Sequence, residues 1–516
     1  MKDIETKQEY LDYVDKKSPN SPILKNCFNA FWVGGLICTI GQFIFEFCKY
    51  KGLDETTCST IVSITLIGIA AILTGLNIFN KIGKFAGAGS LVPITGFANS
   101  IVSPAIEYKS EGYVMGVGGK MFTVAGPVLV FGISASVLVG IIATFFFFFW
   151  RFIGKTLLKN LNILTRSVWF LSYKMLMRKI GNQTIYFETP PYILETSSIV
   201  GPKEAEGPLA KYFDQCLEDE FWGEKTWEKA ESKIIKENVN SVIAKSGISS
   251  QDIDFCFAGD LLNQCISSSF GLREINIPFF GIFGACSTFV EGMCLGSILI
   301  EANAAKNVLC ATSSHFCSAE KQFRFPLELG NQRPQTAQWT VTGSGAAILS
   351  CSNNSKKCPQ ITYVTPGKIV DMGVKDANNM GAAMAPAALD TLMTHLKDTG
   401  RKPSYYDAII TGDLGHVGKS ILTEMAETKG YNIKNNYNDC GVLIFDKDTQ
   451  DTHSGGSGCG CVGSVFSGYF YRKLQEGSIN KILLMATGAL MNSTSSQQGE
   501  SIPGIAHAIA IENLNQ

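Results

Sequence analysis

Apolar residues form long runs in the first third of the chain and alternate with polar residues in the rest. Four apolar runs occupy residues 28–47, 61–79, 85–106 and 122–150. Each approaches or exceeds the roughly 20 residues that an α-helix needs to cross a bilayer. We therefore predict an N-terminal α-helical transmembrane domain of about four helices at residues 27–150, after a polar segment at residues 1–26.

The third run contains residues that break helices. They are Gly87, Gly89, Pro93, Gly96 and Pro104, with Asn99 as an additional polar side chain. At membrane depth, such a backbone is tolerated where it is buried in protein or lines a wet cavity. The run is therefore either part of a transport path or a re-entrant segment without a transport role.

Charge divides the chain near residue 180. Residues 1–180 carry 18 Lys and Arg against 10 Asp and Glu, whereas residues 181–516 carry 26 against 35. The joining segment, residues 151–180, has seven basic residues and no acidic one, which predicts that it lies on the cytoplasmic side of a membrane. The acidic part has no basic stripe with interleaved aromatic residues, so we expect no nucleic-acid partner.

The 16 cysteines are scattered through apolar runs. This distribution is typical of reduced cysteines in a reducing compartment. Only Cys459 and Cys461 are closely spaced, and two ligands are too few for a zinc site. We expect no resident metal and no cofactor.

From residue 181, apolar runs alternate with helical patterns that end in glycine, which predicts an α/β domain at residues 181–516. The pattern occurs twice. Residues 247–261 superpose on residues 400–414, and both stretches contain Gly-Asp-Leu at the end of a predicted strand. Residues 306–312 superpose on residues 481–487. The domain is therefore expected to consist of two related halves.

The second superposition also places Cys286 on Cys461. Cys286 follows a mostly apolar run and opens a helical segment of small residues. At such a strand-to-helix turn, backbone N–H groups and the helix dipole favour a thiolate. The same geometry also binds anions without chemistry. Cys286 is therefore either a nucleophile or part of an anion-binding pocket.

Gly284-Ala-Cys286-Ser resembles the nucleophile elbow of thiolases and ketoacyl synthases. Residues 343–347 and 455–461 resemble a strand and a glycine-rich loop of the same enzymes. The resemblance implies a thiolase-like fold. Those enzymes pair the cysteine with histidine, whereas here Asp413 stands at the strand end and would disfavour a thiolate by like charge. We therefore interpret Cys286 as a relic nucleophile and expect no catalytic residue.

Five histidines are present, and none stands where those enzymes place their catalytic histidine. His416 lies three residues after Asp413 and is either a base or the cap of a helix. His315 and Phe316 follow a predicted strand end. His395 is expected on the surface of a helix, and His453 is expected to face solvent.

Longer stretches are similar to a narrower family. Residues 186–214, 412–418, 453–461 and 484–509 are similar to the stage V sporulation AD family, and residues 21–42 and 87–128 to the AC family of the same complex. The chain looks like a fusion of the two. The resemblance implies a multi-pass protein of the inner forespore or spore membrane, with its thiolase-like domain on the cytoplasmic side. It would move dipicolinic acid, with calcium, into the developing spore and out on germination.

The implied partners are dipicolinic acid, membrane lipid and other subunits of the same transport complex. A flat ring with two carboxylates suits converging N–H donors beside an aromatic wall. The expected ligand-binding residues are Cys286, Ser287, His315, Phe316, Asp413, His416, Gly458, Cys459 and Cys461.

Two further assignments stay open. Phe283 and Phe289 either belong to the aromatic wall or pack in the core. Asp260 and Asp413 either bind the accompanying calcium or cap helices.

Two other functions remain possible for the chain. One is a membrane-tethered ketoacyl synthase or thiolase-type acyl-condensing enzyme that uses Cys286. The other is a scaffold domain that holds a channel and binds no ligand of its own.

Overall fold

The computed structural model describes residues 4, 6–131, 134, 178–353 and 357–514. The chain forms two compact units. The α/β unit comprises Met1–Pro22, Leu176–Phe325 and Arg333–Gln516, and the helical unit comprises Ile23–Met175 and Pro326–Gln332. The division differs from the expected one in two places. The N-terminal segment belongs to the α/β unit, and a short segment of the acidic part belongs to the helical unit.

The α/β unit is built from two halves with the same strand order. The first half has the order β3-β9-β7-β5-β6, and the second has the order β10-β15-β14-β11-β12. In each half the second strand is antiparallel to both of its neighbours, and the last three strands are parallel. The halves join where Gln360 pairs with Tyr192. The predicted α/β domain of two related halves is confirmed.

The strands have the following bounds. The first half contains β3 (Tyr192–Val200), β5 (Phe255–Gly259), β6 (Phe279–Gly281), β7 (Asn307–Ser314) and β9 (Gly343–Ser350). The second contains β10 (Gln360–Thr365), β11 (Ala408–Thr411), β12 (Tyr437–Asp439), β14 (Lys481–Ala489) and β15 (Gly504–Glu512). The short strands are β1 (Arg178–Ile180), β2 (Thr184–Tyr186), β4 (Gln215–Cys216), β8 (Trp339–Thr340) and β13 (Gly456–Ser457).

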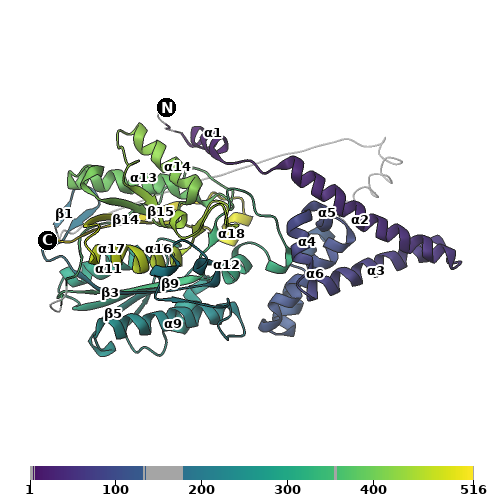
Figure 1. The fold of residues 1–516 in the computed structure, drawn as a ribbon, viewed down its shortest axis with the longest axis horizontal. Helices are drawn as coiled ribbons and strands as arrows, with labels where there is room; N and C mark the ends of the chain where they lie inside the picture. Colours follow the sequence, from purple (N-terminus) through teal and green to yellow (C-terminus); the bar gives the residue numbers. More distant parts are fainter. Residues whose placement is uncertain (1–3, 5, 132–133, 135–177, 354–356, 515–516) are drawn as a thin grey trace, which may run out of the picture. The chain divides into compact units, whose positions relative to one another are not determined.

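The strands of the two halves form one continuous sheet, whose halves are here called the first and the second sheet. Helices cover both and fill the space between them (Figure 1). Helix α9 (Trp227–Ser246) packs on the outer face of the first sheet, and α13 (Met380–Thr399) and α14 (Gly415–Thr428) lie outside the second. Between the sheets lie α11 (Thr288–Glu301) and α16 (Cys459–Val465). Both are apolar over most of their surface, as expected for helices buried on all sides.

The remaining α-helices of the α/β unit have at most 11 residues. They are α1 (Lys7–Lys17), α8 (Pro202–Ala205), α10 (Ile266–Gly271), α12 (Phe316–Phe323), α15 (Cys440–Leu443), α17 (Tyr471–Gln475) and α18 (Ser493–Gln497). Helix α1 lies in the segment that we predicted only as polar. Its Tyr10 and Val14 are buried in the core cluster beneath α13 and α14.

The helical unit contains two helices that are long and apolar enough to cross a membrane among the described residues. They are α2 (Ile23–Tyr50) and α3 (Glu55–Gly75). The interrupted third run, residues 85–106, includes the end of α4 (Phe79–Ala86), all of α5 (Ala88–Leu91) and most of α6 (Ile94–Glu107). Most of the fourth predicted run, residues 122–150, lies outside the described residues. The expected helical domain is thus confirmed, with two candidate spans.

The segment Pro326–Gln332 makes polar contacts inside the helical unit. The side-chain amide of Asn99 donates to the carbonyl of Leu329 at 3.1 Å, and Thr74 donates its hydroxyl to the Asn99 oxygen at 3.0 Å. The amide of Gln332 donates to the carbonyl of Lys84 at 2.9 Å. Asn99 interrupts the apolar run because its buried amide satisfies the backbone of this segment.

Gly89 marks a close approach between α5 and α2. A Cβ atom at this position would lie 2.2 Å from the carbonyl oxygen of Ala30 and 2.6 Å from its Cα. Both atoms belong to backbone, which cannot rotate away. The absence of a side chain is therefore required for these two helices to touch.

We predict that Gly89→Ala destabilises the helical unit by about 1–3 kcal/mol, because the added methyl group forces α5 away from α2. Thermal unfolding of the purified protein in detergent measures the effect. Gly68→Ala is the matched control, since a Cβ atom at position 68 meets no atom within 4 Å. Equal stability of the two variants would contradict the prediction.

Candidate functional site

Cys286 lies at the turn that leads into α11. The preceding residue, Ala285, has a φ of 51°, a left-handed conformation that is uncommon for a residue with a side chain. The Cys286 side chain is buried, and its sulfur lies 3.8 Å from the hydroxyl oxygen of Ser457. Ser287 donates its hydroxyl back to the carbonyl of Gly284 at 2.7 Å. The elbow predicted from the sequence is therefore formed.

Asp413 faces the elbow from the end of β11. Its buried carboxylate accepts hydrogen bonds from the hydroxyl of Thr487 at 2.7 Å, the hydroxyl of Ser457 at 3.0 Å and the backbone N–H of Gly458 at 3.1 Å. Burial raises the pKa of Asp413 to about 6. The carboxylate thus occupies one of the backbone donors that we predicted for a ligand, the N–H of Gly458.

The same contacts determine the protonation of Cys286. Because the Ser457 hydroxyl donates its hydrogen bond to Asp413, its oxygen can only accept a hydrogen bond from the Cys286 thiol. Burial, followed by the nearby charge of Asp413, raises the pKa of the thiol well above its ordinary value. Transfer of the thiol proton to a carboxylate with a pKa near 6 is therefore uphill. The elbow holds a thiol and not a thiolate.

The glycine-rich loop at residues 455–461 contributes two cysteines whose sulfur atoms lie near backbone carbonyl oxygens. The Cys459 sulfur lies 2.9 Å from the carbonyl oxygen of Ser313, and the Cys461 sulfur lies 3.5 Å from that of Gly412. Gly458 has a φ of 105°, and a Cβ atom there would lie 2.6 Å from the hydroxyl oxygen of Ser314. Glycine is required at this position for both reasons.

His315 and Phe316 have partners away from the elbow. The His315 ring accepts from the backbone N–H of Cys317 through Nδ1, so its Nε2 donates to the carbonyl of Glu220 at 2.8 Å. Burial lowers the pKa of His315, which keeps the ring neutral. Phe316 stacks on Trp339 with 3.5 Å between ring centroids.

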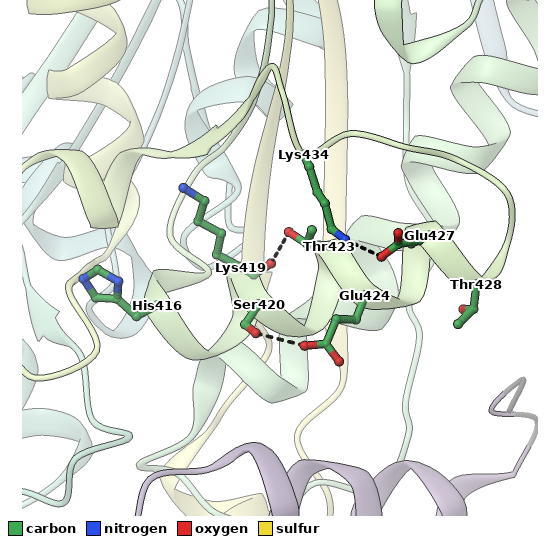
Figure 2. A pocket seen from close by; sticks show the side chains of 8 residues that line it. All are labelled: His416, Lys419, Ser420, Thr423, Glu424, Glu427, Thr428 and Lys434. Atoms are coloured by element: carbon green, nitrogen blue, oxygen red, sulfur yellow. Dashed lines mark hydrogen bonds and ion pairs between the residues drawn. The ribbon is translucent and has the colours of Figure 1, made fainter. Parts of the chain in front are cut away.

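His416 lies in a surface groove of about 920 Å³ along α14, together with Lys419, Glu424 and Lys434. Figure 2 shows its ring at one end of this groove. Burial lowers the pKa of His416. The structure places this histidine on the outer layer of the unit and provides no contact between its ring and Asp413.

The expected exposure of two histidines outside the predicted site was wrong. His395 is fully buried and lies between the hydroxyl of Thr365 at 2.8 Å and that of Tyr406 at 2.6 Å. His453 is mostly buried and contacts the carbonyl of Pro334 at 2.8 Å. In both cases polar partners from distant segments allow the ring to be buried.

Phe283 and Phe289, whose roles the sequence left undecided, differ in burial. Phe289 is fully buried between the sheets and packs 6.0 Å from Phe466, so it belongs to the core. Phe283 remains 48% exposed.

Asp260, the counterpart of Asp413, accepts bonds from the N–H groups of Leu262 and Ser268 and from the Ser268 hydroxyl. These contacts are those of a turn and a helix start. Among the described residues, no group of three or more His, Cys, Asp or Glu side chains is placed to hold a metal ion.

Two arginines that the sequence reasoning missed carry hydrogen-bond donors without acceptors. Arg324 pairs with Glu320 at 2.5 Å, but its Nε and Nη2 are buried without a partner among the described residues. Arg333 lies 5.0 Å from the ring of Trp339, and its Nη1 is likewise without a partner. The signal in the sequence was two arginines on either side of the short apolar turn that contains Leu327 and Leu329.

Arg333 lies beside an aromatic surface, and the charge of Arg324 acts on Arg333. Trp339 stacks on Phe316, and the ammonium group of Lys203 lies 4.2 Å from the Trp339 ring. Buried guanidinium donors with no acceptor favour binding of a carboxylate. The cluster of Lys203, Arg324, Arg333 and Trp339, here called the arginine cluster, is a second place where an anion could bind.

Two family models match the chain. The model for Stage V sporulation protein AD (SpoVAD) matches residues 181–512, and the model for SpoVAC/SpoVAEB sporulation membrane protein matches residues 26–142. Stage V sporulation protein AD of Bacillus subtilis (strain 168) is 43% identical over 336 residues, which cover 65% of this chain and 98% of that protein. Stage V sporulation protein AC of the same organism is 50% identical over 137 residues, 26% of this chain and 91% of that protein.

Solved structures also match the chain at low sequence identity. A 3-oxoacyl-[acyl-carrier-protein] synthase III from Aquifex aeolicus VF5 is 12% identical, with a TM-score of 0.41 over 62% of this chain and 99% of its own. A single-residue variant of OleA from Xanthomonas campestris is 12% identical, with a TM-score of 0.43 over 63% of this chain and 99% of its own.

We predict that Cys286 resists iodoacetamide in the native protein at pH 7.5, reacting at least about 100-fold more slowly than Cys351, because the thiolate is the reactive form and the thiol is buried. Cys351 is exposed and serves as the internal control. Peptide mass spectrometry after timed labelling measures both rates. Comparable labelling of the two cysteines would show that the elbow holds an accessible thiolate.

Proposed function

Since the chain belongs to the stage V sporulation protein AD family through residues 181–512 and to the SpoVAC/SpoVAEB sporulation membrane protein family through residues 26–142, we propose that it is a spore-membrane transport component. In this proposal the α/β unit binds dipicolinic acid without catalysis. The helical unit takes part in moving the ligand into the developing spore and out on germination.

The observation that carries the proposal is the presence of both families in one chain. The two relatives in Bacillus subtilis are separate proteins, and this chain spans 98% of one and 91% of the other. The fusion of an AD-type part to an AC-type membrane part in one chain supports a role at the membrane. The inner forespore membrane, several crossings and a cytoplasmic α/β unit are part of the proposal.

The position of Asp413 supports binding over catalysis. A condensing enzyme needs a base for its cysteine and donors for the negative oxygen that develops on the substrate. Here a buried carboxylate stands beside Cys286 and uses Ser457, Gly458 and Thr487 as its own donors. A thioester enolate at this place would meet like charge instead of free donors.

Two sets of donors could receive the carboxylates of dipicolinic acid, with or without calcium. The first is the predicted site at Cys286, Asp413 and Gly458, which requires that Asp413 gives up its donors or becomes protonated. The second is the arginine cluster, whose buried guanidinium donors need no displacement. Its aromatic pair offers a surface for a flat ring.

A membrane-tethered acyl-condensing enzyme is the second candidate function, favoured by the formed elbow at Cys286. We predict that the full-length protein in detergent binds dipicolinic acid in calorimetry and turns over no acyl-thioester. Isophthalic acid, which has the same two carboxylates without the ring nitrogen, is the matched control ligand. Thioester turnover that disappears in Cys286→Ala would overturn the proposal in favour of the enzyme.

The two donor sets predict different effects of mutation on the affinity for dipicolinic acid. If the ligand binds at the elbow, Asp413→Ala should tighten dipicolinic acid binding by about tenfold, since it removes a like charge and frees three donors. If the ligand binds at the arginine cluster, Arg333→Gln should weaken binding by about tenfold and Asp413→Ala should have no effect. Calorimetry of the full-length variants measures both.

Arg273→Gln is the control for the arginine variant, because Arg273 is exposed and lies over Phe270 on the first half. Thermal unfolding shows whether each variant is folded. Unchanged affinity in all three variants would exclude both donor sets.

A further inference from the structure

Helix α1 is a well-formed helix at the start of the chain. The hydroxyl of Thr6 accepts from the backbone N–H of Glu9 at 3.2 Å, and the Glu9 carboxylate accepts from the backbone N–H of Thr6 at 3.1 Å. This reciprocal pair satisfies two donors that a helix otherwise leaves open at its N-terminus. The helix begins at a defined residue and does not need α2 to set its start.

One face of α1 is buried in the α/β unit. Tyr10 and Val14, four residues apart on the same face, are 0% and 5% exposed. Both belong to the core cluster formed by α13 and α14. The Tyr10 hydroxyl also donates to the carbonyl of Ala382 at 2.5 Å, so that its buried polar atom has a partner.

Polar contacts flank this apolar face along the whole helix. Lys7 pairs with Asp371 at 3.0 Å, and Lys17 pairs with Glu424. Tyr13 donates its hydroxyl to Glu424 at 2.9 Å. The purple ribbon of the N-terminal segment passes close to Glu424 in Figure 2. A buried tyrosine between matched charges is the composition of a specific interface.

Helix α1 is next to the membrane helices in the sequence but packs in the α/β unit. Only five residues separate Lys17 from Ile23, the start of the first candidate membrane helix. By sequence, α1 therefore precedes the part that matches the AC-type membrane family, at residues 26–142. By packing, it belongs to the α/β unit, the part that matches the AD-type family.

We infer that α1 is a docking helix through which an AC-type membrane protein holds an AD-type protein, with the faces of α13 and α14 as its receptor. The partner that this receptor accepts is an amphipathic helix with buried tyrosine and valine one turn apart and lysine at both ends. In this chain the two partners are fused, and the joining segment adds a covalent link to a contact that is specific without it.

A split version of the protein tests this inference. Residues 1–150, with an affinity tag, and residues 178–516 are produced together as two chains and purified through the tag in detergent. The split is justified because the corresponding Bacillus subtilis relatives are separate proteins. Asn99→Leu in the first chain and Gln332→Ala in the second remove hydrogen bonds by which Pro326–Gln332 also joins the two chains. We expect these chains to purify together, and we expect deletion of residues 1–18 to lower recovery of the untagged chain by at least about tenfold.

Substitutions distinguish specific docking from loss of folding. Lys17→Glu should lower recovery, and adding Glu424→Lys to the other chain should restore it, because the reversed pair has the same attraction. Lys16→Glu is the matched control, since Lys16 is an exposed neighbour on the same helix. Recovery that does not depend on residues 1–18, or chains that fail to associate with α1 intact, would overturn the inference.

Discussion

The buried carboxylate of Asp413 ties together the elements that meet at the elbow. It follows β11 and accepts hydrogen bonds from β13, from the N-terminus of α16 and from β14. Through Ser457 it also reaches Cys286 of the first half. A buried carboxylate is tolerated only when such donors converge on it. The donors that an enzyme would use for a developing oxyanion serve here to hold the fold.

The architecture of the α/β unit was predictable because the same pattern of strands and helices occurs twice in the sequence. The Gly-Asp-Leu stretches at Asp260 and Asp413 follow equivalent strands, β5 and β11, and the two predicted strand ends at Thr312 and Thr487 lie on β7 and β14. Local patterns repeat when the same supersecondary unit repeats. The docking of α1 was not predictable in this way. Its two buried residues, Tyr10 and Val14, are too few to stand out in a polar segment.

The candidate site was predictable only in part. The elbow at Cys286 and the glycine at position 458 follow from local backbone requirements, which a sequence motif records. The contact between Asp413 and Thr487 joins residues 74 positions apart, and no local pattern indicates it. His395 was misplaced for a similar reason, since its partners Thr365 and Tyr406 come from other elements and permit its burial.

Each unit of this protein contains a piece of the other's sequence. Helix α1 packs in the α/β unit, and Pro326–Gln332 packs in the helical unit. A ribosome makes a chain from its N-terminus, so domains usually fold in the order in which they emerge. Here α1 leaves the ribosome long before its receptor at α13 and α14 exists, and the helical unit stays incomplete until Gln332 has been made. The last contacts of each unit therefore form only after most of the chain has been translated.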